Sequence, residues 1–401
     1  MANRGNNPLS SNTVRILAII WIGVVAVAGI ITFVVLLITL TNRSERVAAT
    51  VEGQAVPTQI QVPQVTPIPT NSGEPTPEFA PPATFGLLDT LELGGQVPGL
   101  PLEHPQLMHD TGMTWMKFQI KWNPNLNPAD AETLVNAAHE HGLKVLLSIT
   151  GDPYPQTTID YTSYVAYLGQ VAAYKPDAIE VWNEMNLDRE WPAAEINGAT
   201  YVNNMLIPAH DAIKAASPDT AVIIGALAPT GAFGGGCGAV GCDDNAYVAQ
   251  MAQAGAAQYA DCIGVHHNSG TTSPSARTGH VSDNGGNHYS WYFLPTVEVY
   301  YNGMGGALPV CLTEFGYLTP DGFDTPISQN FQWGNNNTVE EQAAWLAEGV
   351  NLSQDLGYVP LVIIWNVDFT RWDEDPQGGY AILRPDGTCP ACATLKAALS
   401  D

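Results

Sequence analysis

The chain has 401 residues, with 14 Lys and Arg against 39 Asp and Glu, which gives a formal net charge of −25. The length allows one large domain or two domains of ordinary size. The acidic surplus excludes most nucleic-acid partners, because such a surface repels phosphate groups.

The N-terminal region contains a long apolar run at residues 16–40 that carries no charged side chain. As a helix rising 1.5 Å per residue, this run can cross a hydrocarbon core of about 30 Å. It is longer than the apolar part of a secretory signal, and no clear cleavage site follows it. We therefore expect an uncleaved, single-pass transmembrane signal anchor at 16–40, preceded by a short cytoplasmic N-terminus at 1–15.

The next segment, residues 41–83, is rich in Pro, Thr, Gln and Val. This composition cannot form a packed core and favours extended, polyproline-like structure. We expect a disordered linker that holds the C-terminal domain away from the cell membrane, on its extracellular side.

Six cysteines lie in the C-terminal region. Cys237 and Cys242 flank a short Gly-rich loop, and Cys389 and Cys392 form a C-x-x-C, so each pair is a candidate short-range disulfide of an extracellular domain. Cys262 and Cys311 fall inside predicted strands, and we expect them to be small buried side chains.

From residue 84 onward, strand signals alternate with helix signals. The helices include 161–174 and one that begins at a Thr338–Glu341 capping box and ends at Gly357. This alternation predicts a (β/α)8 barrel over residues 84–401. A doubly wound open sheet is the alternative, but no Gly-rich turn follows an early strand. The strands are expected at 85–88, 114–118, 144–149, 178–182, 221–225, 262–265, 310–314 and 361–364.

Two glutamates end apolar runs in similar surroundings. Glu184 follows the fourth predicted strand, and Glu314 closes the seventh. In a parallel barrel both would project over the same rim. A carboxyl pair about 5–5.5 Å apart is what a retaining glycosidase needs for one proton donor and one nucleophile. Asn183 could bond a sugar hydroxyl, and Trp365 could offer a flat face to a sugar ring.

Three runs resemble the fourth, seventh and eighth strands of glycoside hydrolase clan A: VWNEMN at 181–186, CLTEFGY at 311–317 and VIIWNVDF at 362–369. Within the clan, the cellulase-like family 5 and the xylosidase-like family 39 are most similar. The resemblance implies Glu184 as general acid/base, Glu314 as nucleophile, Asn183 as partner of a sugar hydroxyl and Trp365 as sugar platform. It implies no metal and no other cofactor.

The sequence departs from the clan pattern at two places. Met185 stands where proline usually follows the acid/base glutamate. The sixth strand of the clan commonly ends in H-x-Y, with the tyrosine bonded to the nucleophile; here His266 is kept and Asn268 takes the place of the tyrosine. Tyr289 or Tyr292, from the following loop, could replace it.

Strand positions also suggest orientations or roles for several other residues. Glu180 has the same strand parity as Glu184, so it should face the barrel interior and pair with a cation such as Lys117. His266 and His267 should face opposite sides of their strand and cannot share one metal ion. Three tryptophans follow predicted strands and could line sugar subsites or pack in the core: Trp122, Trp191 and Trp291.

Together these features predict a retaining O-glycoside hydrolase that cleaves β-glycosidic bonds of a polysaccharide or oligosaccharide. Burial and the charge of Glu314 are expected to raise the pKa of Glu184, so that it stays protonated. The alternative is a non-catalytic, membrane-tethered barrel that binds glycans or mediates adhesion.

Overall fold

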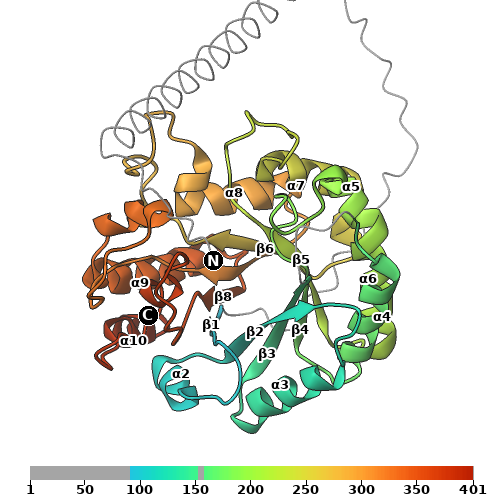
Figure 1. Cartoon of the computed structure of the whole chain (residues 1–401), viewed down its shortest axis with the longest axis horizontal. Helices are drawn as coiled ribbons and strands as arrows, with labels where there is room; N and C mark the ends of the chain where they lie inside the picture. Colours follow the sequence, from blue (N-terminus) through green and yellow to red (C-terminus); the bar gives the residue numbers. More distant parts are fainter. Residues whose placement is uncertain (1–90, 152–157, 401) are drawn as a thin grey trace, which may run out of the picture. The chain divides into compact units, whose positions relative to one another are not determined.

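The computed structural model describes residues 91–151 and 158–400, which form a closed barrel of eight parallel strands in sequential order (Figure 1). Each strand pairs with the next along the chain, and β1 pairs with β8 to close the barrel. The predicted (β/α)8 barrel is therefore confirmed. The strands are β1 Glu92–Gln96, β2 Trp115–Trp122, β3 Lys144–Gly151, β4 Ala178–Val181, β5 Ala221–Leu227, β6 Cys262–His267, β7 Val310–Phe315 and β8 Leu361–Ile364.

Helices surround the strands in the connections between them (Figure 1). The last long helix begins at the predicted capping box, where the Thr338 side chain accepts from Glu341 N–H and the Glu341 carboxylate accepts from Thr338 N–H. Gly357 ends it in the left-handed conformation, with φ of 69°. The α-helices are α2 Pro105–Thr111, α3 Ala129–Glu140, α4 Tyr161–Ala172, α5 Gly198–Tyr201, α6 Ile207–Ala216, α7 Asp244–Gln253, α8 Phe293–Gly303, α9 Val339–Leu356 and α10 Pro390–Ala398.

The first strand lies later than the sequence predicted. The barrel begins with β1, Glu92–Gln96, whereas the predicted strand at 85–88 lies outside the described residues. Two glycines reduce the apolar signal of β1. At Gly94 a Cβ atom would lie 2.6 Å from both Ile363 Cδ1 and Trp115 Cβ, so the close approach of neighbouring side chains requires glycine there.

The predicted cytoplasmic N-terminus at 1–15, the signal anchor at 16–40 and the linker at 41–83 also lie outside the described residues. Within 91–151 and 158–400, no helix has the length and apolar character needed to cross a membrane.

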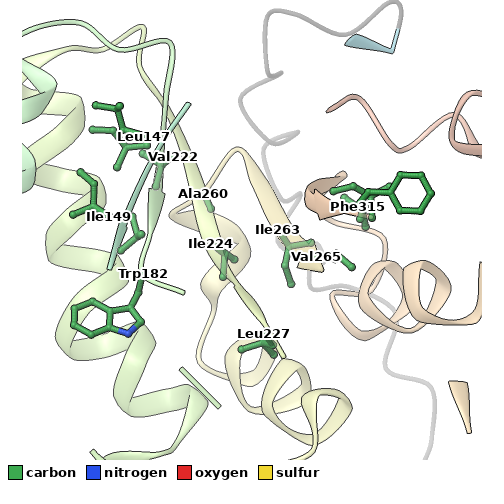
Figure 2. Packing of buried hydrophobic residues seen from close by; sticks show 14 of the residues in the cluster. Leu147, Ile149, Trp182, Val222, Ile224, Leu227, Ala260, Ile263, Val265 and Phe315 are labelled. Atoms are coloured by element: carbon green, nitrogen blue, oxygen red, sulfur yellow. The ribbon is translucent and has the colours of Figure 1, made fainter. Parts of the chain in front are cut away.

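Alternate strand positions build two apolar layers. One set faces the helices, and Figure 2 shows part of it, including Ile149, Ile224 and Ile263. The other set fills the inside of the barrel at the end where the strands begin, as is usual for this fold. That inner cluster consists of Trp115, Leu146, Ala178, Ala221, Ile223, Cys262, Cys311, Leu361 and Ile363.

The inner layer corrects one prediction about the cysteines. Cys262 and Cys311 are not two free buried side chains but a disulfide, with their Cα atoms 6.0 Å apart. Because β6 and β7 are neighbours and both residues face the barrel interior, the strand pairing brings the two sulfur atoms together. The two predicted short-range disulfides, Cys237–Cys242 and Cys389–Cys392, are present.

Candidate active site

The backbone turns sharply where β4 ends. Trp182 and Glu184 both have positive φ, 78° and 45°, which is unusual for residues other than glycine. The Trp182 ring is buried and donates from its indole N–H to Glu190 O at 3.0 Å, while Glu184 N–H donates to Ala226 O on β5 at 2.7 Å. These contacts fix the turn and hold the Glu184 carboxylate at the C-terminal end of the barrel.

Glu184 and Glu314 converge on one imidazole. His266 Nδ1, at the end of β6, lies 3.1 Å from Glu184 Oε1 and 3.6 Å from Glu314 Oε2. The carboxylates come from β4 and β7, on opposite sides of β6 along the sheet, and their side chains are 13% and 9% exposed. The structure thus brings the two predicted catalytic glutamates together in a largely buried site that solvent can still reach.

Glu314 receives two further donors. Lys117 Nζ, from β2, lies 3.3 Å from Glu314 Oε1 and also donates to Thr313 O at 2.9 Å. Asn268 Nδ2 donates to Glu314 Oε2 at 2.9 Å. Lys117 and Asn268 therefore hold both oxygens of Glu314 in place.

Glu180 pairs with Lys117, as its strand parity predicted. Lys117 Nζ lies 3.6 Å from Glu180 Oε2, and both side chains are fully buried. The other oxygen, Oε1, accepts from Thr313 Oγ1 at 2.7 Å and from Ala226 N–H at 3.2 Å. Lys117 therefore links Glu180 to Glu314 through the barrel interior.

The suggested tyrosine substitutes are wrong. The Tyr289 hydroxyl donates to Asp244, and the Tyr292 hydroxyl donates to Asp283 Oδ2 at 2.7 Å. The acidic partner of Tyr289 is thus the first residue of α7, and that of Tyr292 lies in the loop after β6. Asn268, rather than either tyrosine, donates to Glu314.

Sequence reasoning missed Arg189, which lies five residues after Glu184 in the loop that follows β4. Its guanidinium donates to Glu184 Oε2. The side chain is 60% exposed, so it covers the carboxylate from the solvent side. Its place directly after the strand that bears Glu184, in a chain with few cations, was the available signal.

This pairing overturns the expected pKa of Glu184. Burial by itself raises that pKa, but the nearby charge of Arg189 and the bond from His266 outweigh burial and lower the pKa to about 2. For His266 the balance is similar: burial lowers its pKa, but the negative charges of Glu314 and Glu184 raise it above the usual value. In the unliganded protein, Glu184 is thus a carboxylate.

The candidate sugar-binding residues fall into different surroundings. Asn183 is 5% exposed, and its Oδ1 has no hydrogen-bond partner among the described residues. Trp365 is half-buried beside Phe369, with the ring centroids 5.2 Å apart. Trp122 is only 4% exposed and packs edge-on against Tyr164, which favours a role in the core.

The remaining aromatic and histidine candidates are mostly structural. Trp191 is fully buried against Trp182. Trp291 stacks on His280, with centroids 4.4 Å apart. His267 faces away from His266 and contacts Phe293, so the expected opposite orientation is confirmed. Over 91–151 and 158–400, no group of three His, Cys, Asp or Glu side chains could hold a metal ion.

No protein-family model and no curated protein sequence matches the chain. Several solved structures do match the chain. An endo-β-1,4-mannanase from Thermotoga petrophila is 14% identical, with a TM-score of 0.50, over 79% of this chain and 78% of that one. A fungal β-1,4-galactanase is 14% identical, with a TM-score of 0.50, over 76% and 94%.

A GH10 endoxylanase from a sugarcane soil metagenome is 13% identical, with a TM-score of 0.50, over 77% of this chain and 97% of that one. At such low identity, the likeness establishes the shared barrel fold.

Proposed function

We propose that this chain is a retaining O-glycoside hydrolase that cleaves β-glycosidic bonds of a polysaccharide or oligosaccharide. The observation that carries the proposal is the convergence of Glu184 and Glu314 on His266 Nδ1, at 3.1 and 3.6 Å. Two carboxylates that reach the same nitrogen atom suit the spacing of about 5–5.5 Å in retaining enzymes.

Glu314 is the nucleophile in this proposal. Lys117 and Asn268 donate to its two oxygens and orient it for attack on the anomeric carbon. Glu184 gives a proton to the leaving oxygen, and then takes a proton from the water that releases the sugar from Glu314. Asn183 would accept a bond from a sugar hydroxyl through its unpartnered Oδ1, and Trp365 would pack against the ring.

The assignment is tested with Glu184→Gln and aryl β-glycosides whose leaving groups differ in acidity. The variant should still release good leaving groups in the first step, because these need no proton. The rate of that step with poor leaving groups should fall at least about 100-fold. A burst of released aryl group, measured by stopped flow, reports that step. The exposed Glu340→Gln change on α9 is the control and should leave the rates unchanged.

Glu314→Ala should abolish hydrolysis, and full activity in that variant would overturn the proposal. The anomeric configuration of the first product, followed by NMR, tests retention. The mannanase, galactanase and endoxylanase descriptions of the similar structures suggest the substrate panel: β-mannan, β-galactan and xylan, with β-glucans added.

A non-catalytic glycan-binding barrel is the second candidate, and one contact favours it. Arg189 donates to one oxygen of Glu184 and His266 lies against the other, and these contacts lower the pKa of Glu184 to about 2, so the carboxylate carries no proton to donate. If Arg189 stayed in place when glycan bound, the site would hold sugar without cleaving it. Binding of the same panel without product formation would support this candidate.

We further propose that the barrel is displayed outside the cell on a membrane anchor. The support is the apolar run at 16–40, the proline-rich segment at 41–83 and the three disulfides of the barrel, which suit an oxidising compartment. In cells that produce the full chain, external protease should remove the barrel from the membrane fraction. Protection of the barrel in intact cells would contradict this location.

A further inference from the structure

The contact between Arg189 and Glu184 sets a requirement for catalysis. Arg189 donates to Oε2 of Glu184, and His266 lies against Oε1. A general acid must carry a proton and direct it at the leaving oxygen. Glu184 can do neither while the guanidinium occupies Oε2 and the imidazole lies against Oε1, so the guanidinium must leave Oε2 before the first step.

The Arg189 guanidinium can leave Glu184 by movement of the Arg189 side chain alone. The side chain is 60% exposed, whereas that of Glu184 is 13% exposed. The backbone of its loop, by contrast, is tied down: Asp188 N–H donates to Val240 O at 3.0 Å, and Cys242 N–H donates to Asn186 O at 2.8 Å. Val240 lies within the loop closed by the Cys237–Cys242 disulfide. A fixed backbone with an exposed guanidinium at the mouth of the site is suited to meeting an incoming ligand.

The charges of the site indicate which ligand group releases it. Two cations, Lys117 and Arg189, and the His266 imidazole contact three carboxylates, Glu180, Glu184 and Glu314. A further pair lies beside them: Glu190, whose pKa burial raises, and Lys121, whose charge opposes that rise. The cluster therefore has no surplus of positive charge, and Arg189 is already paired in the unliganded protein.

A neutral sugar offers Arg189 no counter-charge to replace Glu184. A carboxylate does, because the planar guanidinium bonds carboxylates through paired N–H groups and would exchange one carboxylate for another. The added negative charge also leaves Glu184 without its cationic partner. Glu184 then takes up a proton from solvent, which offsets the added negative charge and supplies the proton that the leaving oxygen needs.

We propose that this barrel acts on acidic glycans, in which the carboxylate of a hexuronic acid on the leaving-group side binds Arg189 and frees Glu184. The inference rests on the proposed function. In the reaction, the proton taken up by Glu184 passes to the glycosidic oxygen as the bond from that oxygen to the anomeric carbon breaks. Glu314 supplies the electron pair that forms the new bond to the same carbon.

Calorimetric titration of the full chain tests the inference. The probes are oligomers of β-1,4-linked glucuronate and mannuronate, each compared with the cello- or manno-oligosaccharide of the same length. Titration in buffers of different ionisation enthalpy gives the number of protons taken up. The protein should bind at least one uronate about 10-fold more tightly than its neutral counterpart, with uptake of close to one proton.

Arg189→Gln should remove both the preference and the proton uptake. Arg277→Gln is the matched control, because Arg277 is 53% exposed and pairs with Glu298, away from the glutamate pair. Absence of uronate binding, equal or tighter binding of the neutral oligomers, or a preference that survives Arg189→Gln would overturn the inference.

Hydrolysis of the same oligomers separates this inference from the proposed function. Uronate binding that depends on Arg189, without product, would overturn the hydrolase proposal and support the inferred ligand class. Cleavage of neutral oligomers, with no uronate preference, would support the hydrolase proposal and overturn the inferred ligand class.

Discussion

Glu184 and Glu314 have the same side chain but different partners, and the partners divide their roles. Glu314 accepts from a buried lysine and an amide, Lys117 and Asn268. Glu184 accepts from His266 and from an exposed arginine that can move away. A permanently supported carboxylate suits a nucleophile, whereas a carboxylate with a removable cation suits a group that must alternate between acid and base.

Asn268 offers a test of the support around the nucleophile. Asn268→Ala removes a donor to a charged acceptor, which is worth about 1.5–3 kcal/mol, so kcat/KM should fall about 10- to 100-fold. Asn268→Asp should lower kcat/KM further than Asn268→Ala, because it places a second carboxylate beside Glu314. Steady-state rates on an aryl β-glycoside measure both effects. The exposed Asn335→Ala change is the control, and equal rates for the Asn268 variants and that control would contradict the role.

At the scale of the residue, sequence reasoning located the two carboxylates that converge on His266 but not all of their surroundings. The parity of Glu180 with Glu184 correctly predicted an interior carboxylate paired with Lys117. That Lys117 also reaches Glu314 depends on β2 and β7 facing each other across the barrel, which no local pattern encodes. The pKa of Glu184 was misjudged for the same reason, because Arg189 was not placed against it.

At the scale of the element, the β6 and β7 strands are joined both by hydrogen bonds and by a covalent bond. Cys262 and Cys311 enclose a stretch with a sequence separation of 49. A crosslink over such a loop restricts the unfolded chain and contributes about 2–4 kcal/mol to the free energy of unfolding.

Cys262→Ala/Cys311→Ala should therefore lower the free energy of unfolding by about 2–4 kcal/mol, measured with guanidinium chloride. Cys389→Ala/Cys392→Ala is the matched comparison and should cost less, because that disulfide spans a separation of only 3. Thiol titration of the unfolded, unreduced chain should detect none of the six cysteines as free. Two reactive thiols that vanish in the Cys262/Cys311 variant would show that this disulfide does not form.

Element types were more predictable than element edges. The α9 helix followed from its capping box and its glycine, because the signals that begin and end a helix lie within a few residues of its ends. The β1 strand was misplaced, because Gly94 is required by neighbours on β2 and β8, Trp115 and Ile363, rather than by its own sequence.

At the scale of the whole molecule, buried histidines link stability to pH. Burial, with a smaller contribution from the charge of His280, lowers the pKa of His267 from 6.5 to about 3. As the pH falls below 6.5, the unfolded chain binds a proton at this position that the folded chain rejects. The contribution of His267 to the free energy of unfolding is therefore fully present above pH 6.5. It is lost as the pH falls from 6.5 to about 3, by up to about 1.4 kcal/mol per pH unit.

Three other groups modify this loss. His280, whose pKa burial also lowers, adds to it. His266, with a raised pKa, opposes it, because its stabilising charge is present at low pH and is lost as the pH rises. Glu184 adds a further loss only below 4.5, as the pH falls towards its pKa of about 2.

His267→Phe should flatten the fall in the urea midpoint between pH 6.5 and 4.5, because phenylalanine takes up no proton and suits the aromatic neighbours Phe293 and Phe315. The exposed His141→Gln change should leave the pH dependence as it is in the wild type. An unchanged slope in His267→Phe would mean that His267 is not responsible for the acid sensitivity.

The sequence by itself determined the barrel and the pair of glutamates at the ends of β4 and β7. These depend on local signals: the alternation of strand and helix, and the polar residue that ends each apolar run. Only the tertiary structure decided what surrounds the pair, namely Arg189 on Glu184, Asn268 and Lys117 on Glu314, and Cys262 joined to Cys311. Such contacts depend on strand register, the closure of the barrel and the paths of its loops, and none of these can be read from a short stretch of chain.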